Sequence, residues 1–144
     1  MQRIEQYLDL MLHVLRADGV VDPAEREKFM AIMVEGLQLR PELVERYRKA
    51  LECSEWNEVS DEELAALGEG LDPGSIGHMV KDAYAMAEAD GNFDVSELVL
   101  VRRFLKAIGI PESRLEAIDN WARVSLEVAR KGERLFARVP QEAR

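Results

Sequence analysis

The sequence predicts an all-α fold, a single-domain bundle of about seven helices, and two observations lead to this prediction. Apolar residues recur at spacings of three and four along most of the chain, which is the period of an amphipathic helix. Strand-like alternation of apolar and polar residues is not found in the sequence. With 144 residues, of which 47% are hydrophobic and 33% charged, the chain is long enough and apolar enough to bury one core.

The first part of the chain is predicted to hold three helices. The first ends near Ala17, where Gly19 suits the left-handed position that closes a helix. The second begins at Asp22 and Pro23, because proline fits the first turn of a helix, and the third opens at Pro41 for the same reason. Their apolar faces comprise Ile4, Tyr7, Leu8, Met11, Leu12 and Leu15, then Phe29, Ile32, Met33 and Leu37, then Leu43, Val44, Tyr47 and Leu51.

The middle of the chain is acidic. No basic residue occurs between Lys49 and Lys81, and we interpret the acidic run there as a solvated face. Ser60 and Glu63 have the spacing of a capping box, which predicts a short helix after them. The stretch "LDPGSIG", residues 71–77, is predicted to be a connector, because proline and glycine usually interrupt helices.

The helical pattern then starts again, with two further helices followed by a long last one that is predicted to extend toward Val139. This gives one domain over residues 1–139, with internal helix–turn–helix repeats at about 1–52 and 73–128, an acidic connector at 53–72, and a frayed tail at 140–144. The predicted apolar faces are Met79, Ala83, Met86 and Ala87, then Leu98, Val101, Phe104, Leu105 and Ile108, then Leu115, Ile118, Trp121, Ala122, Val124 and Val128.

The charge balance limits the classes of partner. Nineteen basic and 28 acidic residues give a net charge of -9, which argues against nucleic-acid binding and is compatible with a basic protein partner or a cation. Cys53 is the single cysteine, so an intramolecular disulfide is excluded and a cytoplasmic location is expected. The sequence has no apolar run that predicts a transmembrane segment. The basic, apolar stretch "ARKGERLFARV" could dock on a partner or an anionic membrane surface, or be an ordinary last helix.

One acidic turn occurs twice, as "RADGVVDPAE" at residues 16–25 and "EADGNFDVSE" at residues 88–97. Asp22 and Glu25, like Asp94 and Glu97, are spaced as a capping box, in which the aspartate accepts a backbone N–H and the glutamate reaches back to the cap. Each such cap stabilises a helix by about 1 kcal/mol. Capping therefore accounts for these four residues without a ligand.

Asp18 and Asp90 need another explanation. Each follows the end of a helix, where the negative end of the dipole disfavours a carboxylate. Backbone N–H groups of the turn could compensate, and so could a bound cation. Neither copy matches a complete EF-hand loop, because the first and third ligand positions hold Val14 and Arg16 in one copy and Met86 and Glu88 in the other. A smaller oxygen site, or one shared by both turns, stays open.

These two turns, in an acidic helical chain of this length, resemble the tellurite-resistance TerB family and the similar helical domain of the co-chaperone DjlA. The resemblance extends from about Tyr7 to Ile118. It implies a compact helical bundle with a role in bacterial stress response, and a divalent cation (Ca, Mg, Mn or Zn) as possible ligand. The family's acidic motif residues map onto Asp18, Asp22, Glu25, Asp90, Asp94 and Glu97.

The functional hypothesis is a non-enzymatic binding or scaffold module with a protein partner, in which the acidic turns bind a cation. The alternative is a purely structural interaction domain whose turns serve only as caps. A hydrolase that uses paired carboxylates is a weaker alternative. His13, His78 and Cys53 have no recognisable catalytic companions, and "GEGLDPGSIGHMVK" lacks the GK[ST] of a phosphate loop.

Overall fold

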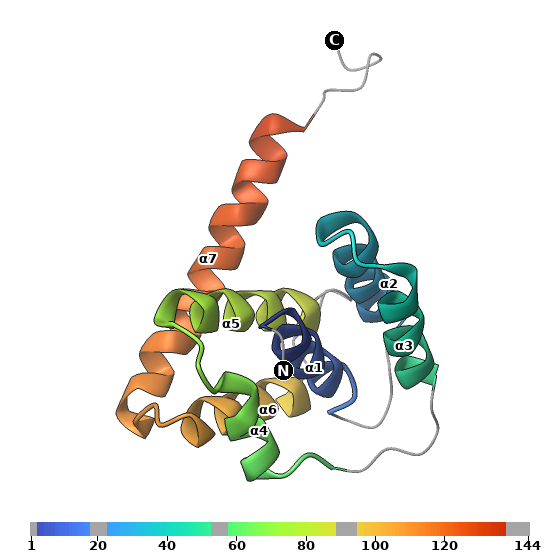
Figure 1. The fold of residues 1–144 in the computed structure, drawn as a ribbon. Helices are drawn as coiled ribbons and strands as arrows, with labels where there is room; N and C mark the ends of the chain where they lie inside the picture. The colour runs from blue at the N-terminus through green and yellow to red at the C-terminus, as the bar shows by residue number, and fades with distance from the viewer. Residues whose placement is uncertain (1–2, 18–22, 53–57, 89–94, 138–144) are drawn as a thin grey trace.

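The computed structural model describes residues 3–17, 23–52, 58–88 and 95–137, and this part of the chain forms seven α-helices and no strand (Figure 1). The all-α prediction is confirmed. None of the described helices is long and apolar enough to cross a membrane. The elements are α1 (Arg3–Leu15), α2 (Pro23–Ala31), the π-helix η1 (Ile32–Gly36), α3 (Pro41–Glu52), α4 (Asp61–Gly68), α5 (Pro73–Ala87), α6 (Val95–Ala107), the 3-10 turn η2 (Glu112–Arg114) and α7 (Leu115–Phe136).

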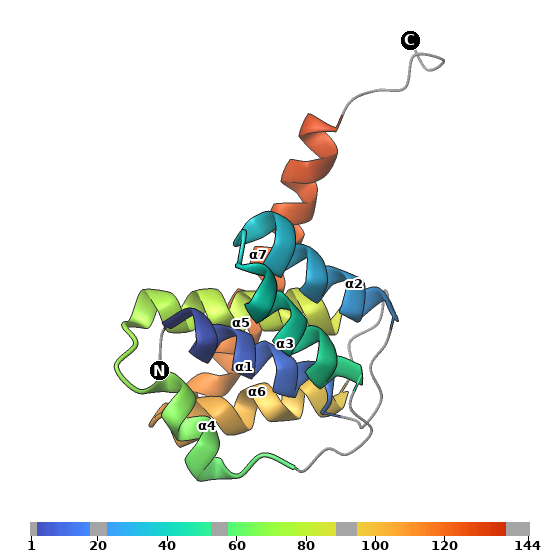
Figure 2. The same cartoon turned by 45° about the vertical axis from the view of Figure 1, so that its right-hand side comes forward.

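Helix α1 lies at the centre of the bundle and contacts α2, α3, α4, α5 and α6 (Figures 1 and 2). The sequence predicts one apolar face for this helix. The structure buries more, because Leu10 and Val14, which lie outside that face, are fully buried. Because this helix has five neighbours, most of its side chains are buried, and a buried polar side chain on it needs a partner within the protein.

Gln6 is such a polar side chain, and it is only 5% exposed. Its amide nitrogen donates to the carbonyl oxygens of Leu67, at 3.1 Å, and Glu69, at 2.9 Å. These carbonyls belong to the C-terminal end of α4, where a helix has no partners of its own for its last acceptors. One buried amide thereby fixes the end of α4 against α1.

Three tyrosine hydroxyls join pairs of helices by donating to carboxylates. Burial raises the pKa of each tyrosine above its ordinary value, and the hydrogen bond to the neighbouring carboxylate raises it further. The folded protein therefore favours the neutral phenol. The bonds are Tyr7 to Asp82 at 2.5 Å, Tyr47 to Asp9 at 2.7 Å and Tyr84 to Asp119 at 2.6 Å.

The predicted connector at residues 71–77 is wrong, because α5 begins at Pro73 and runs through both glycines. Pro73 occupies the first turn, where a missing N–H costs nothing. A Cβ on Gly77 would lie 3.4 Å from Cη2 of Trp121, so the glycine allows α7 to approach α5 closely. The glycine there serves packing and does not interrupt the helix.

The other local predictions have mixed outcomes. The capping box is confirmed, since Ser60 Oγ accepts from the N–H of Glu63 at 3.1 Å and the Glu63 carboxylate accepts from the N–H of Ser60 at 3.2 Å. The second helix changes to a π-helix at Ile32. The predicted apolar face of the last helix is partly wrong, because Trp121, Val124 and Val128 are exposed. Gly19, Cys53, Val139 and the tail at 140–144 lie outside the described residues, and the two-repeat organisation stays a prediction.

We expect Gly68→Ala to lower the free energy of unfolding by about 1 to 3 kcal/mol, the usual cost of overpacking a core. A Cβ at Gly68 would lie 2.4 Å from Cγ2 of Ile108, and this branched side chain cannot easily move away. Urea denaturation followed by circular dichroism measures the change. In the control Gly132→Ala, the added Cβ meets nothing within 4 Å. That variant should be neutral or slightly more stable, and equal losses in the two would contradict the packing of α4 on Ile108.

The tyrosine contacts predict a loss of stability at alkaline pH. The pKa of each tyrosine is higher in the folded than in the unfolded state, so its contribution is complete below about pH 10, the ordinary tyrosine pKa, and falls as the pH rises above it. Urea denaturation across this range should show the decline. Tyr84→Phe should make the decline shallower, and an unchanged slope would count against the contact with Asp119.

Candidate functional site

Two of the six acidic residues that the sequence singles out lie in the described part of the chain. Glu25 is the third residue of α2, and Glu97 is the third residue of α6. Both are buried, with exposed fractions of 3% and 1%. Asp18, Asp22, Asp90 and Asp94 lie outside the described residues.

The helix ends that border the two acidic turns come together in pairs. Arg16 and Ala17, after the end of α1, line a cavity of about 460 Å³ with Val95 and Ser96, at the start of α6. Figures 1 and 2 both show the end of α1, the start of α2, the end of α5 and the start of α6 on one side of the molecule.

The second pair meets at another cavity, of about 780 Å³, which is lined by Ala24 near the start of α2 and by Glu88 after the end of α5. The end of α1 thus lies beside the start of α6, and the start of α2 lies beside the end of α5. The flanks of the two turns are neighbours in space although they are far apart in the sequence.

Glu25 and Glu97 are more deeply buried than the glutamate of the capping box at Ser60. Both are the third residue of their helix, which is the position of the glutamate in a capping box, as the sequence predicts. The complete capping box of this chain, at Ser60, has an exposed glutamate, Glu63. A carboxylate at the surface can perform that role with no loss of hydration, whereas a buried one loses hydration that other groups must replace. Glu25 and Glu97 therefore share the helix position of Glu63 but differ from it in burial.

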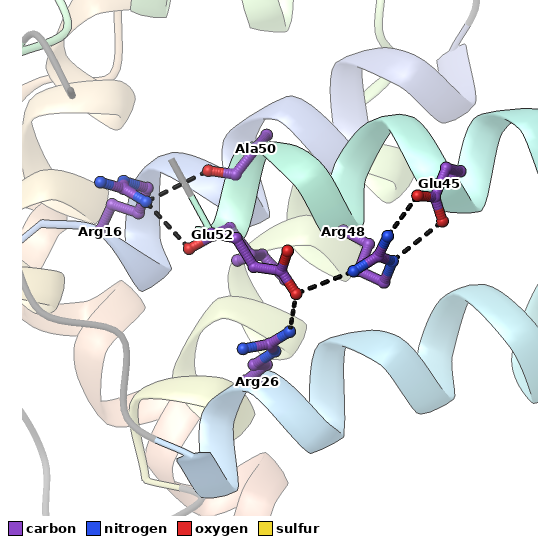
Figure 3. A network of polar contacts seen from close by, with 7 residues as sticks. Arg16, Arg26, Glu45, Arg48, Ala50 and Glu52 are labelled. Carbon is purple, nitrogen blue, oxygen red and sulfur yellow. Dashed lines mark hydrogen bonds and ion pairs between the residues drawn. The ribbon is translucent and has the colours of Figure 1, made fainter. Parts of the chain in front are cut away.

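Arg16 adds a buried positive charge beside the first turn. It is 7% exposed, and its Nη1 donates to the carbonyl oxygens of Ala50, at 3.2 Å, and Leu51, at 3.1 Å (Figure 3). These are among the last acceptors of α3, where the helix dipole favours a cation. The side chain thus fastens the end of α3 to the segment that leads into the turn.

An exposed network connects the first turn of α2 to the same end of α3. Arg26 donates to Glu52 at 2.6 Å, and Arg48 bridges Glu52, at 2.9 Å, and Glu45 (Figure 3). The hydrogen bond from Arg26 is the main cause of the lowered pKa of Glu52. Ion pairs this exposed contribute little to stability, so we assign the network a role in orientation.

Glu88 and His13 line the two cavities near the turns. Glu88, which the sequence places just before Asp90, forms an ion pair with Arg130 of α7 and has a side chain only 9% exposed. Arg130 carries no local sequence signal that predicts a contact with Glu88, because the two residues lie far apart along the chain. Burial lowers the pKa of His13, although Asp9 and Glu63 oppose that shift, so the imidazole favours its neutral form.

The comparisons with known proteins give one result. A family model described as "Tellurite resistance protein TerB" matches residues 5–120. The chain belongs to the TerB family. No match was found among curated proteins or among solved structures. The match includes both acidic turns, and it ends before Trp121, inside α7.

In this TerB-family chain, the described residues contain no group of three or more histidine, cysteine, aspartate or glutamate side chains placed to hold a metal. What they do contain is one buried carboxylate for each turn, Glu25 and Glu97. Carboxylate oxygens are the donors that hard divalent cations prefer. The carboxylate oxygens of Glu25 and Glu97 are therefore of the type that such an ion binds.

We expect Arg16→Met to lower the free energy of unfolding by about 1.5 to 3 kcal/mol, because it removes a charged donor from two carbonyls of α3 while retaining an apolar stem. Urea denaturation checks the value. The matched control is Arg26→Met, which removes only an exposed ion pair and should cost about 1 kcal/mol or less. A loss no larger for Arg16 than for Arg26 would contradict the role of Arg16.

Proposed function

We propose that this chain is a non-enzymatic TerB-family binding module whose two acidic turns together hold one divalent cation. The observation that carries the proposal is the burial of Glu25 and Glu97 at equivalent positions in helices whose ends border the two turns. A cation shared by the two turns would favour the ionised form of both carboxylates.

The ligand set consists of Glu25 and Glu97 with the four aspartates of the motif, Asp18, Asp22, Asp90 and Asp94. All six are hard oxygen donors, which favours calcium, magnesium or manganese over zinc. A shared site also accounts for the two aspartates that follow helix ends, because a cation offsets the unfavourable dipole there.

The cation would act on the shape of the module. It would join the first turn to the second and so hold α1, α2, α5 and α6 in one arrangement at that side of the bundle. A partner protein in the cytoplasm would then recognise the joined form. The family's description supports a role in a tellurite-type stress response, and the excess of acidic residues supports a partner other than nucleic acid.

The alternative, in which the turns are helix caps only, has one observation in its favour. Glu25 and Glu97 are third residues of their helices, which is the position a capping box requires. The two functions differ in what a cation does to stability. A cap is indifferent to the ion, whereas a ligand transfers the binding energy of the ion to the folded state.

Thermal unfolding with and without millimolar calcium, magnesium, manganese or zinc tests the proposal. At a concentration 100 times Kd a bound ion stabilises the fold by about 2.7 kcal/mol, which raises the Tm of a chain of this size by roughly 10 °C. We expect such a rise in the wild type with at least one hard cation, and a rise smaller by more than half in Glu97→Gln.

The control variant is Glu63→Gln, which changes an exposed capping glutamate outside the motif and should retain the full rise. If no cation shifts the wild-type Tm, the shared site is excluded and the capping alternative stands. If Glu97→Gln shifts as much as the wild type, the ion binds somewhere else.

A further inference from the structure

The last part of α7 is a second unexplained feature, and it is independent of the acidic turns. The helix leaves the bundle and extends into solvent (Figures 1 and 2). All residues from Glu127 to Phe136 are exposed except Gly132, which is half-buried. This part also lies beyond the residues that the family model matches. It therefore lies outside the matched segment.

An apolar stripe follows this helix on its solvent side. It is formed by Trp121, Val124, Val128 and Leu135, with exposed fractions of 46%, 57%, 64% and 69%. The steps of three, four and seven residues are those of the a and d positions of a coiled coil, and Lys131 occupies the d position between Val128 and Leu135. An amphipathic face of this kind is typical of a helix that pairs with another helix.

We propose that α7 pairs in antiparallel orientation with α7 of a second copy of this chain. The structure contains the hole that such pairing needs. A groove of about 540 Å³ is lined by Trp121, Val124, Ser125 and Val128, together with Asn120 and Ala129 of α7 and Lys81 of α5. The first four of these residues are the a, d, e and next a positions that surround a knob in a coiled coil. Antiparallel pairing places Leu135 of the second copy over this hole, opposite Val124.

Charge selects the orientation. In the register that pairs Val124 with Leu135, Glu127 of each copy flanks the seam opposite Arg134 of the other, which gives two complementary pairs. In a parallel pair, Glu127 would face Gly132 of the second copy and gain no partner. A second copy is thus complementary to this face in both shape and charge.

Contacts with α5 hold part of α7 against the bundle. The ion pair between Arg130 and Glu88 and the contact of Trp121 with the Lys81 ammonium, 5.9 Å from the ring centroid, anchor α7 on α5. In an antiparallel pair the two bundles lie at opposite ends of the joined helices. The contact is limited to one helix from each copy, so the association should be weak and dependent on concentration.

Sedimentation velocity of the full chain over a range of concentrations tests the pairing. We expect the wild type to change reversibly from monomer to dimer. Glu127→Arg and Arg134→Glu should each weaken association by roughly tenfold or more. Each substitution turns both Glu127–Arg134 pairs of the dimer into pairs of like charge. An equimolar mixture of the two variants should associate at least as well as the wild type, since every flanking pair is then complementary.

Leu135→Ser tests the apolar seam, and it should also weaken the dimer by roughly tenfold or more. Its matched control is Val99→Ser on α6, an exposed apolar residue away from α7 that should leave association unchanged. A chain that stays monomeric at every concentration overturns the proposal. The proposal is also overturned if Leu135→Ser leaves the dimer intact. It is overturned likewise if the mixture of the two charge variants fails to associate.

Discussion

The central position of α1 is the constraint on which the rest of the structure depends. Helix α1 contacts five other helices, so most of its side chains are buried, and its buried polar groups find partners in the fold. Gln6 binds the end of α4, and Arg16 binds the end of α3. The same side chains therefore position two other helices. Because α1 leads directly into the first acidic turn, the core also determines where that turn begins.

Helix α5 has a comparable role for the second turn. Asp82 of α5 accepts from Tyr7 of α1, and Tyr84 donates to Asp119 of α7, so α5 is fixed between two neighbours. The flanks of both turns are thereby brought to one side of the bundle. Two buried glutamates, Glu25 and Glu97, belong to the helices that begin after the two turns. The proposed cation would offset negative charge at that side of the bundle.

Local signals in the sequence predicted what is decided locally. The capping box at Ser60 and the proline-initiated helix at Pro41 depend on a few adjacent residues, and both are as expected. Features set by distant elements were missed. Gly77 resembles a helix breaker until Trp121 packs against it, and Val128 resembles a core residue until α7 is seen to leave the bundle. The burial of Glu25 and Glu97 was missed for the same reason, because the sequence of each turn does not indicate which distant elements pack against these side chains.

The number of cations bound by each chain, measured by isothermal titration calorimetry, tests the central claim most directly. A site shared between the two turns predicts one ion per chain, and loss of that binding in Glu25→Gln and in Glu97→Gln alike. Two ions per chain, with each variant losing only one, would mean that the turns act separately. Absence of binding by calcium, magnesium and manganese would contradict the account and leave the two buried glutamates as helix caps.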